Sequence, residues 1–145
     1  MTRTTIALVL AGGRGSRLTP LTDHRPKPAV PLAGSFSLID VTLSNLANSG
    51  LRNVWVAEQY LPNHLNRHLA GGRPWDLDGT RDGLRILPPR EGGEGDGFTE
   101  GNGHALYQHL AEVERFGADT LVVCSADHLY QLDFRDVLDQ HDRLG

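Results

Sequence analysis

The sequence is poor in cysteine and contains no long hydrophobic run. Cys124 is the one cysteine among 145 residues, so the chain cannot build an internal disulfide framework. That cysteine lies inside an apolar stretch and suits a reducing compartment, which favours a cytoplasmic protein. No stretch approaches the roughly 20 apolar residues that a membrane-crossing helix needs. We therefore expect neither a secreted disulfide scaffold nor a membrane protein.

An excess of positive charge is missing as well. The formal net charge is -4 and the isoelectric point is about 5.9, so the chain has no electrostatic footprint for nucleic acid. Hydrophobic residues make up 39% of the chain and charged residues 22%, which is typical of a soluble globular protein. At this length we predict one compact domain over residues 1–145.

The first apolar run raises a choice between an export signal and a buried strand. Residues 6–11 read IALVLA and lead directly into a loop rich in glycine and arginine. A secretory signal has a basic start, a longer apolar core and a small-residue cleavage site, and this run is too short for one. We interpret it as a buried strand that ends at a glycine loop.

Apolar runs and helical patterns alternate along the chain. Runs of Val, Ile and Leu without alternation indicate strands covered on both faces of a parallel sheet, and they occupy residues 6–11, 54–57 and 121–124, with a shorter strand at 84–88. Helices are predicted between a cap at Ser37 and a stop at Gly50, over 61–69, between a cap at Asn102 and a stop at Gly117, and over 134–144. This order predicts an α/β fold with a doubly wound, Rossmann-like and mostly parallel sheet. The glycine-rich remainder of residues 71–103, including EGGEGDG at 91–97, is expected to form loops.

The loop after the first strand is the first candidate site, because ligands bind beyond the carboxyl ends of parallel strands. It lacks the Gly-Lys-Ser/Thr of a P-loop, and Leu18 stands where the dinucleotide fingerprint needs its last glycine. What remains is Gly12, Gly13 and Gly15, whose amides can turn toward an anion, beside arginines that bind phosphate in bidentate fashion. A plain glycine turn next to a solvated basic loop is the alternative. The preceding strand and the following Arg17 favour a phosphate site.

A second basic element follows at Arg25-Pro26-Lys27-Pro28. Prolines on both sides of Lys27 restrict the backbone, so a stiff segment presents the ammonium group. A preorganised cation beside phosphates is a common means of stabilising charge in phosphoryl transfer. Lys27 is therefore a candidate catalytic residue.

These motifs resemble a known family. AGGRGSRLTPLT at 11–22 and RPKPAVPLAG at 25–34 are similar to the sugar-phosphate nucleotidylyltransferases. SFSLIDVTLSNLANSGLRNVWVAEQY at 35–60 resembles the glucose-1-phosphate adenylyltransferase branch, and CSADHLYQLD at 124–133 resembles its later Asp-His-x-Tyr element. The resemblance covers nearly the whole chain, with the motifs in the family's order.

The resemblance implies the formation of a nucleoside-diphosphate sugar and pyrophosphate from a nucleoside triphosphate, with ATP favoured, and a sugar 1-phosphate, as in glycogen biosynthesis. Gly12, Gly13 and Gly15 would cradle the triphosphate, flanked by Leu10, Ala11 and Ser16. Arg17 would neutralise the leaving pyrophosphate and Lys27 would bridge phosphates at the reacting centre. Asp127 would hold Mg²⁺, and a carboxylate after a buried strand is a sensible ligand for that ion. A strand-end cap is the structural alternative for Asp127.

Two further segments are candidates for recognising the base. Gln59 follows the second strand, and its amide can both donate and accept hydrogen bonds, as base edges require. Gly101 and Asn102 open a helix and could bring backbone amides to the nucleotide, although simple capping by Asn102 would explain the pattern too.

The sequence departs from the family at three places. LPPREGGEG at 87–95 replaces a Pro-Ala-Gln-Gln-Arg segment that contributes to base recognition, and GNGHA at 101–105 is closer to the uridylyltransferases. His24 stands where bacterial members often carry a lysine for a sugar-phosphate activator. Family members also continue with sugar-binding residues and a second metal carboxylate, and they assemble as homo-oligomers. We therefore expect the nucleotide-binding half of the enzyme, with a non-catalytic nucleotide-binding or regulatory module as the alternative.

Other residues are interpreted as structural. His64 and His68 have a zinc-like spacing but no third ligand, and we interpret them as surface histidines on a core-packing helix. His128 could tune the metal site beside Asp127, but we expect it to pack beneath the sheet. Trp55 lies within a strand and is expected in the core. Trp75 lies in a loop, where stacking on a base remains an alternative to a structural role.

Overall fold

The structure of the chain is a computed structural model that describes residues 3–13, 15–59, 62–89 and 101–145. A four-stranded parallel sheet forms its centre, in the order β5-β4-β1-β6. The strands are β1 (Thr5–Ala11), β4 (Asn53–Glu58), β5 (Gly83–Leu87) and β6 (Thr120–Ser125). Each coincides with an apolar run that the sequence predicted to be a strand, although β5 ends one residue early, and the α/β fold class is confirmed. The expected burial on both faces is wrong for β6, because it is an edge strand and its Val123 is 45% exposed.

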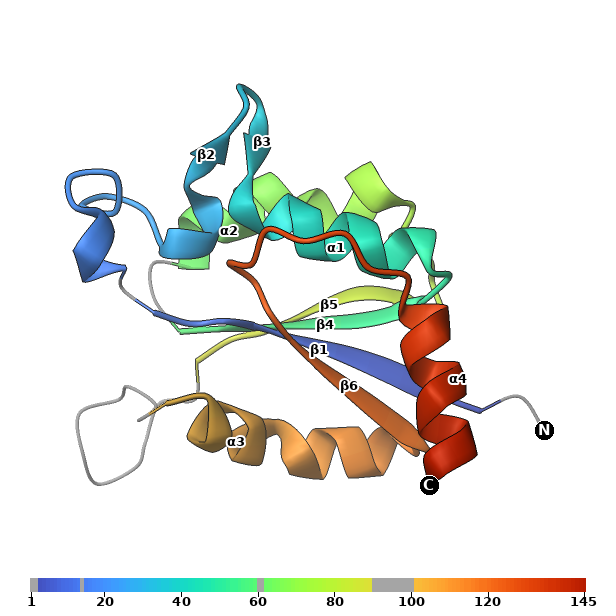
Figure 1. The fold of residues 1–145 in the computed structure, drawn as a ribbon. Helices are drawn as coiled ribbons and strands as arrows, with labels where there is room; N and C mark the ends of the chain where they lie inside the picture. Colours follow the sequence, from blue (N-terminus) through green and yellow to red (C-terminus); the bar gives the residue numbers. More distant parts are fainter. Residues whose placement is uncertain (1–2, 14, 60–61, 90–100) are drawn as a thin grey trace.

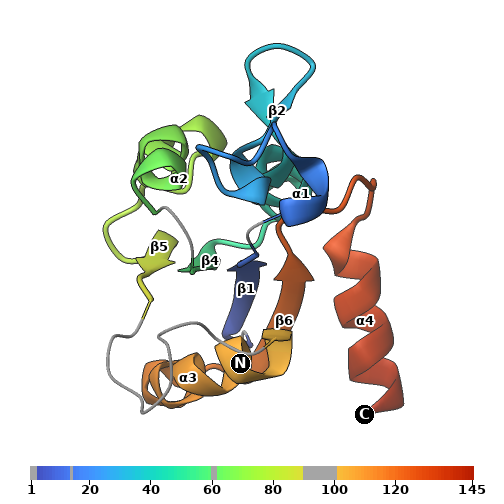
Figure 2. The ribbon, with the colours of Figure 1, turned by 90° about the vertical axis from the view of Figure 1, so that its left-hand side faces the viewer.

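Helices cover both faces of the sheet (Figure 1). The helices α1 (Leu38–Asn48) and α2 (Pro62–Leu69) lie on one face, and α3 (Gly101–Phe116) lies on the other. The view along the strands in Figure 2 shows α4 (Phe134–Leu144) beside the sheet, next to the edge strand β6. The doubly wound arrangement buries β1 on both faces of the sheet.

Side chains of β1 alternate between two hydrophobic clusters. Ala7, Val9 and Ala11 join the cluster built with Leu43 of α1 and Leu65 of α2. Their neighbours in β1 join the cluster on the α3 side, which contains Ile6, Leu8, Leu10, Trp55, Ala57, Leu87, Ala105 and Val113. Every residue from Ile6 to Ala11 is therefore buried, which explains why this run is continuously apolar.

The strand register fixes which residues leave the sheet together. Leu10 is opposite Ala57 in β4 and Ser125 in β6, and Ala11 is opposite Glu58. All of these strands run in the same direction, so their carboxyl ends meet at one edge of the sheet. The segments that follow the three strands start from nearly the same level along the strand axis.

The helix boundaries agree with most of the predicted signals. Ser37 caps α1 in a reciprocal capping box with Asp40, whose Oδ2 accepts from the Ser37 amide at 3.0 Å. Gly50 and Gly117 follow α1 and α3 with φ angles of 78° and 77°, in the left-handed region that ends helices. The predicted cap at Asn102 is wrong, because α3 already begins at Gly101 and Asn102 lies inside its first turn.

Several short elements have no counterpart in the predictions. A two-stranded hairpin, β2 (Pro31–Leu32) with β3 (Phe36–Ser37), precedes α1. The 3-10 helices η1 (Ser16–Leu18) and η2 (Lys27–Ala29) fold the basic segments, and η3 (Ala70–Trp75) begins the stretch expected to be loop. The expected loop at 91–97 lies outside the described residues. Among the helices in the described part of the chain, none combines the length and apolarity that crossing a bilayer requires.

The Leu43 side chain gives a direct test of the α1–sheet core. It is 0% exposed, so Leu43→Ala should lower the free energy of unfolding by about 3 kcal/mol through lost burial and a residual cavity. Leu144→Ala is the matched control, because Leu144 is 78% exposed and its truncation should change that free energy by less than about 0.5 kcal/mol. Urea unfolding followed by circular dichroism measures both. Equal effects of the two substitutions would contradict the assigned core.

Candidate functional site

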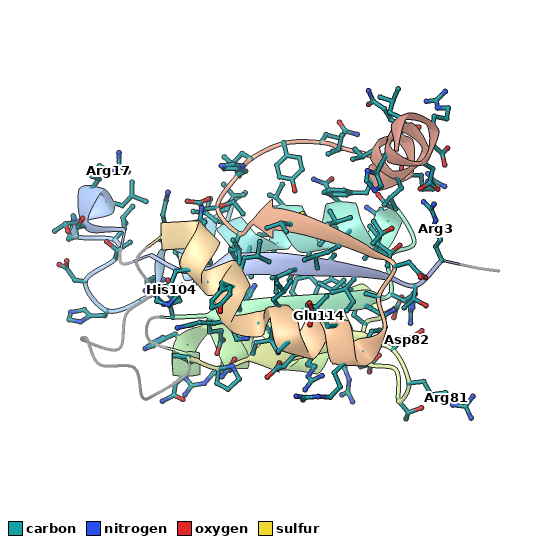
Figure 3. The ribbon with its side chains drawn as sticks, turned by 90° about the horizontal axis from the view of Figure 1, so that it is seen from below. Arg3, Arg17, Arg81, Asp82, His104 and Glu114 are labelled. Carbon is teal, nitrogen blue, oxygen red and sulfur yellow. The ribbon has the colours of Figure 1, made fainter. Side chains whose placement is uncertain are left out.

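Three polar segments meet at the carboxyl edge of the sheet. Counting on from the paired residues Ala11 and Glu58 brings Gly12 level with Gln59, and counting on from Leu10 and Ser125 brings Gly12 level with Asp127. Figure 3 shows Arg17 and His104 at this end of the molecule, whereas Arg3, Arg81 and Asp82 lie at the opposite end. The predicted site residues are thus brought to one edge.

Gln59 lies directly over Gly12. A Cβ atom built on Gly12 would overlap Oε1 of the Gln59 side chain, so a larger residue at this position would displace the amide. The next glycine, Gly13, has a φ of 110°, and apart from its chain neighbours no heavy atom of the described residues lies within 4 Å of a Cβ built there. The loop therefore combines a covered first glycine with an open second one.

The third glycine of the loop is packed against the basic segment. Gly15 has a φ of 65°, and a Cβ built there would lie 2.9 Å from Cβ of Lys27 and 2.9 Å from the methyl group of Thr22. The Thr22 hydroxyl donates to the Gly15 carbonyl at 2.8 Å, and Thr22 is buried. These contacts hold the glycine loop and the Lys27 segment together. Thr22 was not predicted, because the sequence gives no signal for it beyond its place between the two motifs.

Lys27 and Asp127 form an ion pair across 100 positions of the sequence. Their side chains are 32% and 24% exposed, and Lys27 is the only lysine in the chain. The Ser125 hydroxyl donates to the other oxygen of the same carboxylate. Partial burial works to raise the pKa of Asp127, but the hydrogen bonds from Lys27 and Ser125 and the charge of Lys27 outweigh it and lower that pKa. Asp127 is therefore an anion held by two hydrogen bonds at the carboxyl end of β6.

The Asp127 carboxylate has the chemistry of a magnesium ligand. Mg²⁺ is commonly bound through one or two carboxylates plus substrate phosphates, with the remaining positions held by water. Within the described residues no group of three or more His, Cys, Asp and Glu side chains could hold a metal ion. The residues thus fit a magnesium ion that arrives with a phosphate ligand, rather than one held by the protein alone.

The other predicted residues border this centre. Leu10 and Ala11 end β1 and are buried, so their contribution is through the backbone. Ser16 and Arg17 are exposed in η1, and Gly101 and Asn102 are exposed in the first turn of α3. Ala105, one turn further, packs in the same cluster as Leu10, which brings the start of α3 close to the glycine loop. Arg14 lies outside the described residues.

A buried carboxyl group at the end of β4 was not predicted. Glu58 is 2% exposed, and burial raises its pKa from 4.5 to about 7, with a hydrogen bond to Asn66 opposing the rise. An acidic residue at the end of the apolar run VWVA is a sequence signal that could have revealed it.

Three of the structural predictions need correction or completion. His68 is not a free surface histidine, because its Nε2 lies 2.6 Å from Oδ1 of the buried Asp40. His128 does not pack beneath the sheet, since its side chain is 71% exposed and 3.9 Å from the Asp127 carboxylate. Trp55 is buried as predicted, and the indole of Trp75 donates to the Ser44 hydroxyl.

Comparison with known proteins identifies the family. The family described as Nucleotidyl transferase matches residues 6–145, which is nearly the entire chain. The chain belongs to this nucleotidyltransferase family. Its parallel α/β sheet with a glycine loop after the first strand is the Rossmann-like arrangement that the sequence predicted.

Three similar proteins carry a more specific name. The chain is 47% identical over 139 residues to a glucose-1-phosphate adenylyltransferase of Pseudothermotoga lettingae, covering 96% of this chain and 33% of that protein. It is 44% identical over 137 residues to proteins of the same name from Thermotoga maritima and Thermotoga sp. strain RQ2, covering 94% of this chain and 32% of each. The chain thus spans about a third of the length of these relatives.

The Lys27–Asp127 pair predicts the titration of the carboxylate. Replacing the ammonium group in Lys27→Met should raise the pKa of Asp127, because the hydrogen bond and the charge that lower it are lost. Methionine keeps the stem that contacts Gly15. Arg25→Met removes one positive charge from the same segment and should leave the pKa of Asp127 where it was. Carboxyl-carbon NMR titrations measure both, and an unchanged Asp127 in Lys27→Met would contradict the pair.

Burial of Glu58 predicts a loss of stability with rising pH. In the unfolded chain the carboxyl titrates near 4.5 and in the folded chain near 7, so the unfolded state binds fewer protons between these values. The free energy of unfolding should fall across this window, by up to about 3 kcal/mol from this group. Glu58→Gln should remove the part of this decrease in the free energy of unfolding that comes from Glu58. Urea unfolding at about pH 5 and about pH 8 measures the difference, and parallel pH profiles of the two proteins would contradict it.

Proposed function

We propose that this chain carries the nucleoside-triphosphate half of a glucose-1-phosphate adenylyltransferase, which forms ADP-glucose and pyrophosphate from ATP and glucose 1-phosphate. One observation carries the proposal. The glycine loop, Gln59 and the Lys27–Asp127 pair lie at one edge of the sheet, in a chain 44% to 47% identical to proteins of that name. The preference for ATP and for glucose 1-phosphate rests on the name of those relatives.

The loop residues supply the binding of the triphosphate. The amides of Gly12, Gly13 and Gly15 offer donors to phosphate oxygens, and the open surroundings of Gly13 leave space for close approach. Arg17 is exposed in η1 and can bind the two phosphates that leave as pyrophosphate. Gln59, above Gly12, is suited to hydrogen-bond the base.

In the proposed reaction an oxygen of the sugar phosphate attacks the α-phosphorus as the bond from that phosphorus to the bridging oxygen breaks, and pyrophosphate leaves with the electron pair. The protein's task is to align the two reactants and to neutralise charge. Lys27, held by Asp127 and by its contact with Gly15, presents its ammonium group where negative charge increases. A magnesium ion bound by Asp127 and the phosphates would supply further neutralisation of that charge.

The wider setting follows from the same proposal. A glucose-1-phosphate adenylyltransferase supplies the activated sugar for glycogen synthesis in the cytoplasm, and we propose that the full-length protein assembles as a homo-oligomer. A non-catalytic nucleotide-binding module of the same fold is the second candidate. One observation favours it: within the described residues, no group of three or more His, Cys, Asp and Glu side chains could hold a metal ion.

Calorimetric titration of this chain with ATP, UTP, GTP and dTTP, with and without Mg²⁺, tests the proposal. We expect binding of ATP that requires Mg²⁺ and is at least about tenfold weaker in Arg17→Ala and in Asp127→Asn, because each loses a charge-assisted contact. Arg81→Ala is the matched control, since Arg81 lies at the opposite end of the sheet.

Two outcomes decide between the candidates. Release of pyrophosphate when glucose 1-phosphate is added to the ATP complex of the full-length protein identifies an enzyme, whereas magnesium-dependent binding without turnover by that full-length protein supports the non-catalytic module. Failure of all four triphosphates to bind would contradict both candidates.

A further inference from the structure

Glu58 is a buried acid that the proposed site does not use. It is the last residue of β4 and is 2% exposed. Strand alternation places it on the α1–α2 face, with Val54 and Val56 of the same strand. Burying a carboxyl group in such surroundings is costly unless it is hydrogen-bonded. The group therefore needs both a partner and a reason to be there.

The partner is Asn66 on α2. The side-chain amide of Asn66 lies against the carboxyl group, and we assign its nitrogen to the position that is 2.5 Å from Oε1 and 3.2 Å from Oε2 of Glu58, because a nitrogen there donates to both oxygens. In the part of the chain that the structure describes, no Lys, Arg or His forms an ion pair with Glu58. A carboxylate accepts from the amide nitrogen and a carboxylic acid donates to the amide oxygen, so the two groups can bond in either protonation state. The contact joins the end of β4 to the middle of α2.

In the sequence, Gln59 lies between Glu58 and Asn66, the two residues that this contact joins. Its backbone follows Glu58, which is held by its pairing with Ala11 and by Asn66. Its side chain covers Gly12, the first residue of the glycine loop. A shift of the β4 end relative to α2 would therefore move the Gln59 amide relative to the loop.

We propose that Glu58 and Asn66 form a positioning pair that holds the Gln59 amide over Gly12 and thereby sets the affinity for the base of the nucleotide. The inference rests on the proposed function, because it assigns the Gln59 side of the site to the base. Glu58 itself is too deeply buried to touch the nucleotide. It acts through Gln59, and the phosphates bind independently of it on the amides of the loop.

Inorganic tripolyphosphate separates this role from a merely structural one. ATP engages both the loop and the base side of the site, whereas tripolyphosphate has no base and engages the loop alone. A positioning pair for Gln59 changes the binding of ATP and leaves the binding of tripolyphosphate unchanged. A general loosening of the fold weakens both ligands together.

The test measures the dissociation constants of Mg²⁺-ATP and Mg²⁺-tripolyphosphate for this chain by calorimetry. Glu58→Gln keeps a hydrogen-bonding group of the same shape and should bind ATP within about threefold of the unaltered chain. Glu58→Leu removes the hydrogen bond to Asn66. It should raise the dissociation constant of Mg²⁺-ATP about tenfold, which corresponds to the loss of roughly one hydrogen bond. The dissociation constant of Mg²⁺-tripolyphosphate should stay unchanged. Circular dichroism establishes that each variant is folded.

Asn66→Ala provides the second route if Glu58→Leu does not fold. It should reproduce the selective loss of ATP affinity, and Asn63→Ala, at an exposed position of the same helix, should not. Equal ATP affinity in Glu58→Leu, Asn66→Ala and the unaltered chain would overturn the inference, as would a parallel loss of ATP and tripolyphosphate. Failure of the unaltered chain to bind either ligand would instead overturn the proposed function.

Discussion

The parallel pairing of β1 with β4 on one side and β6 on the other is the constraint on which the rest of the structure depends. Because β1 is buried on both faces and bonded at both edges, its residues are apolar from Ile6 to Ala11 and its register is fixed. That register sets Gly12, Gln59 and Asp127 at one level beyond the sheet. A slip of one residue would turn the Glu58 side chain to the α3 face and part it from Asn66.

Side-chain contacts then close the site around the glycine loop. Gly12 is covered by the Gln59 amide, and Gly15 is covered by Thr22 and the stem of Lys27. Among the described residues, none other than its chain neighbours comes within 4 Å of a Cβ built on Gly13. The Lys27–Asp127 pair adds a connection between the first basic segment and the end of β6. The glycine loop and the Lys27–Asp127 pair thus contribute both to the packing of this edge and to the placement of charge there.

The sequence was sufficient for the fold and for the convergence of the main candidate residues at one sheet edge, because the relevant signals are local. Continuous apolar runs indicated the strands, and Ser37 and Gly117 marked helix ends through capping chemistry that neighbouring residues supply. The glycine loop and Lys27 were recognisable from residue type and spacing alone. Their convergence with Asp127 followed from the rule that parallel strands end at one edge.

The features that were missed depend on contacts between distant segments. The pairing of Asn66 with Glu58, of His68 with Asp40 and of Thr22 with Gly15 requires knowing how α2 and the basic segment dock on the sheet. Asn102 was misassigned because its capping preference is local, whereas the start of α3 is set by packing of the helix on the sheet, with Ala105 in the cluster of Leu10.

The central claim is that one edge of the sheet binds a nucleoside triphosphate, and backbone amide NMR of this chain during titration with Mg²⁺-ATP tests it most directly. The account predicts that the largest shifts occur at Gly12, Gly13 and Gly15 and at the side-chain amide of Gln59. Residues at the opposite end of the sheet, such as Arg81 and Asp82, should be unaffected. No shifts at saturating ATP, or shifts confined to that opposite end, would contradict it.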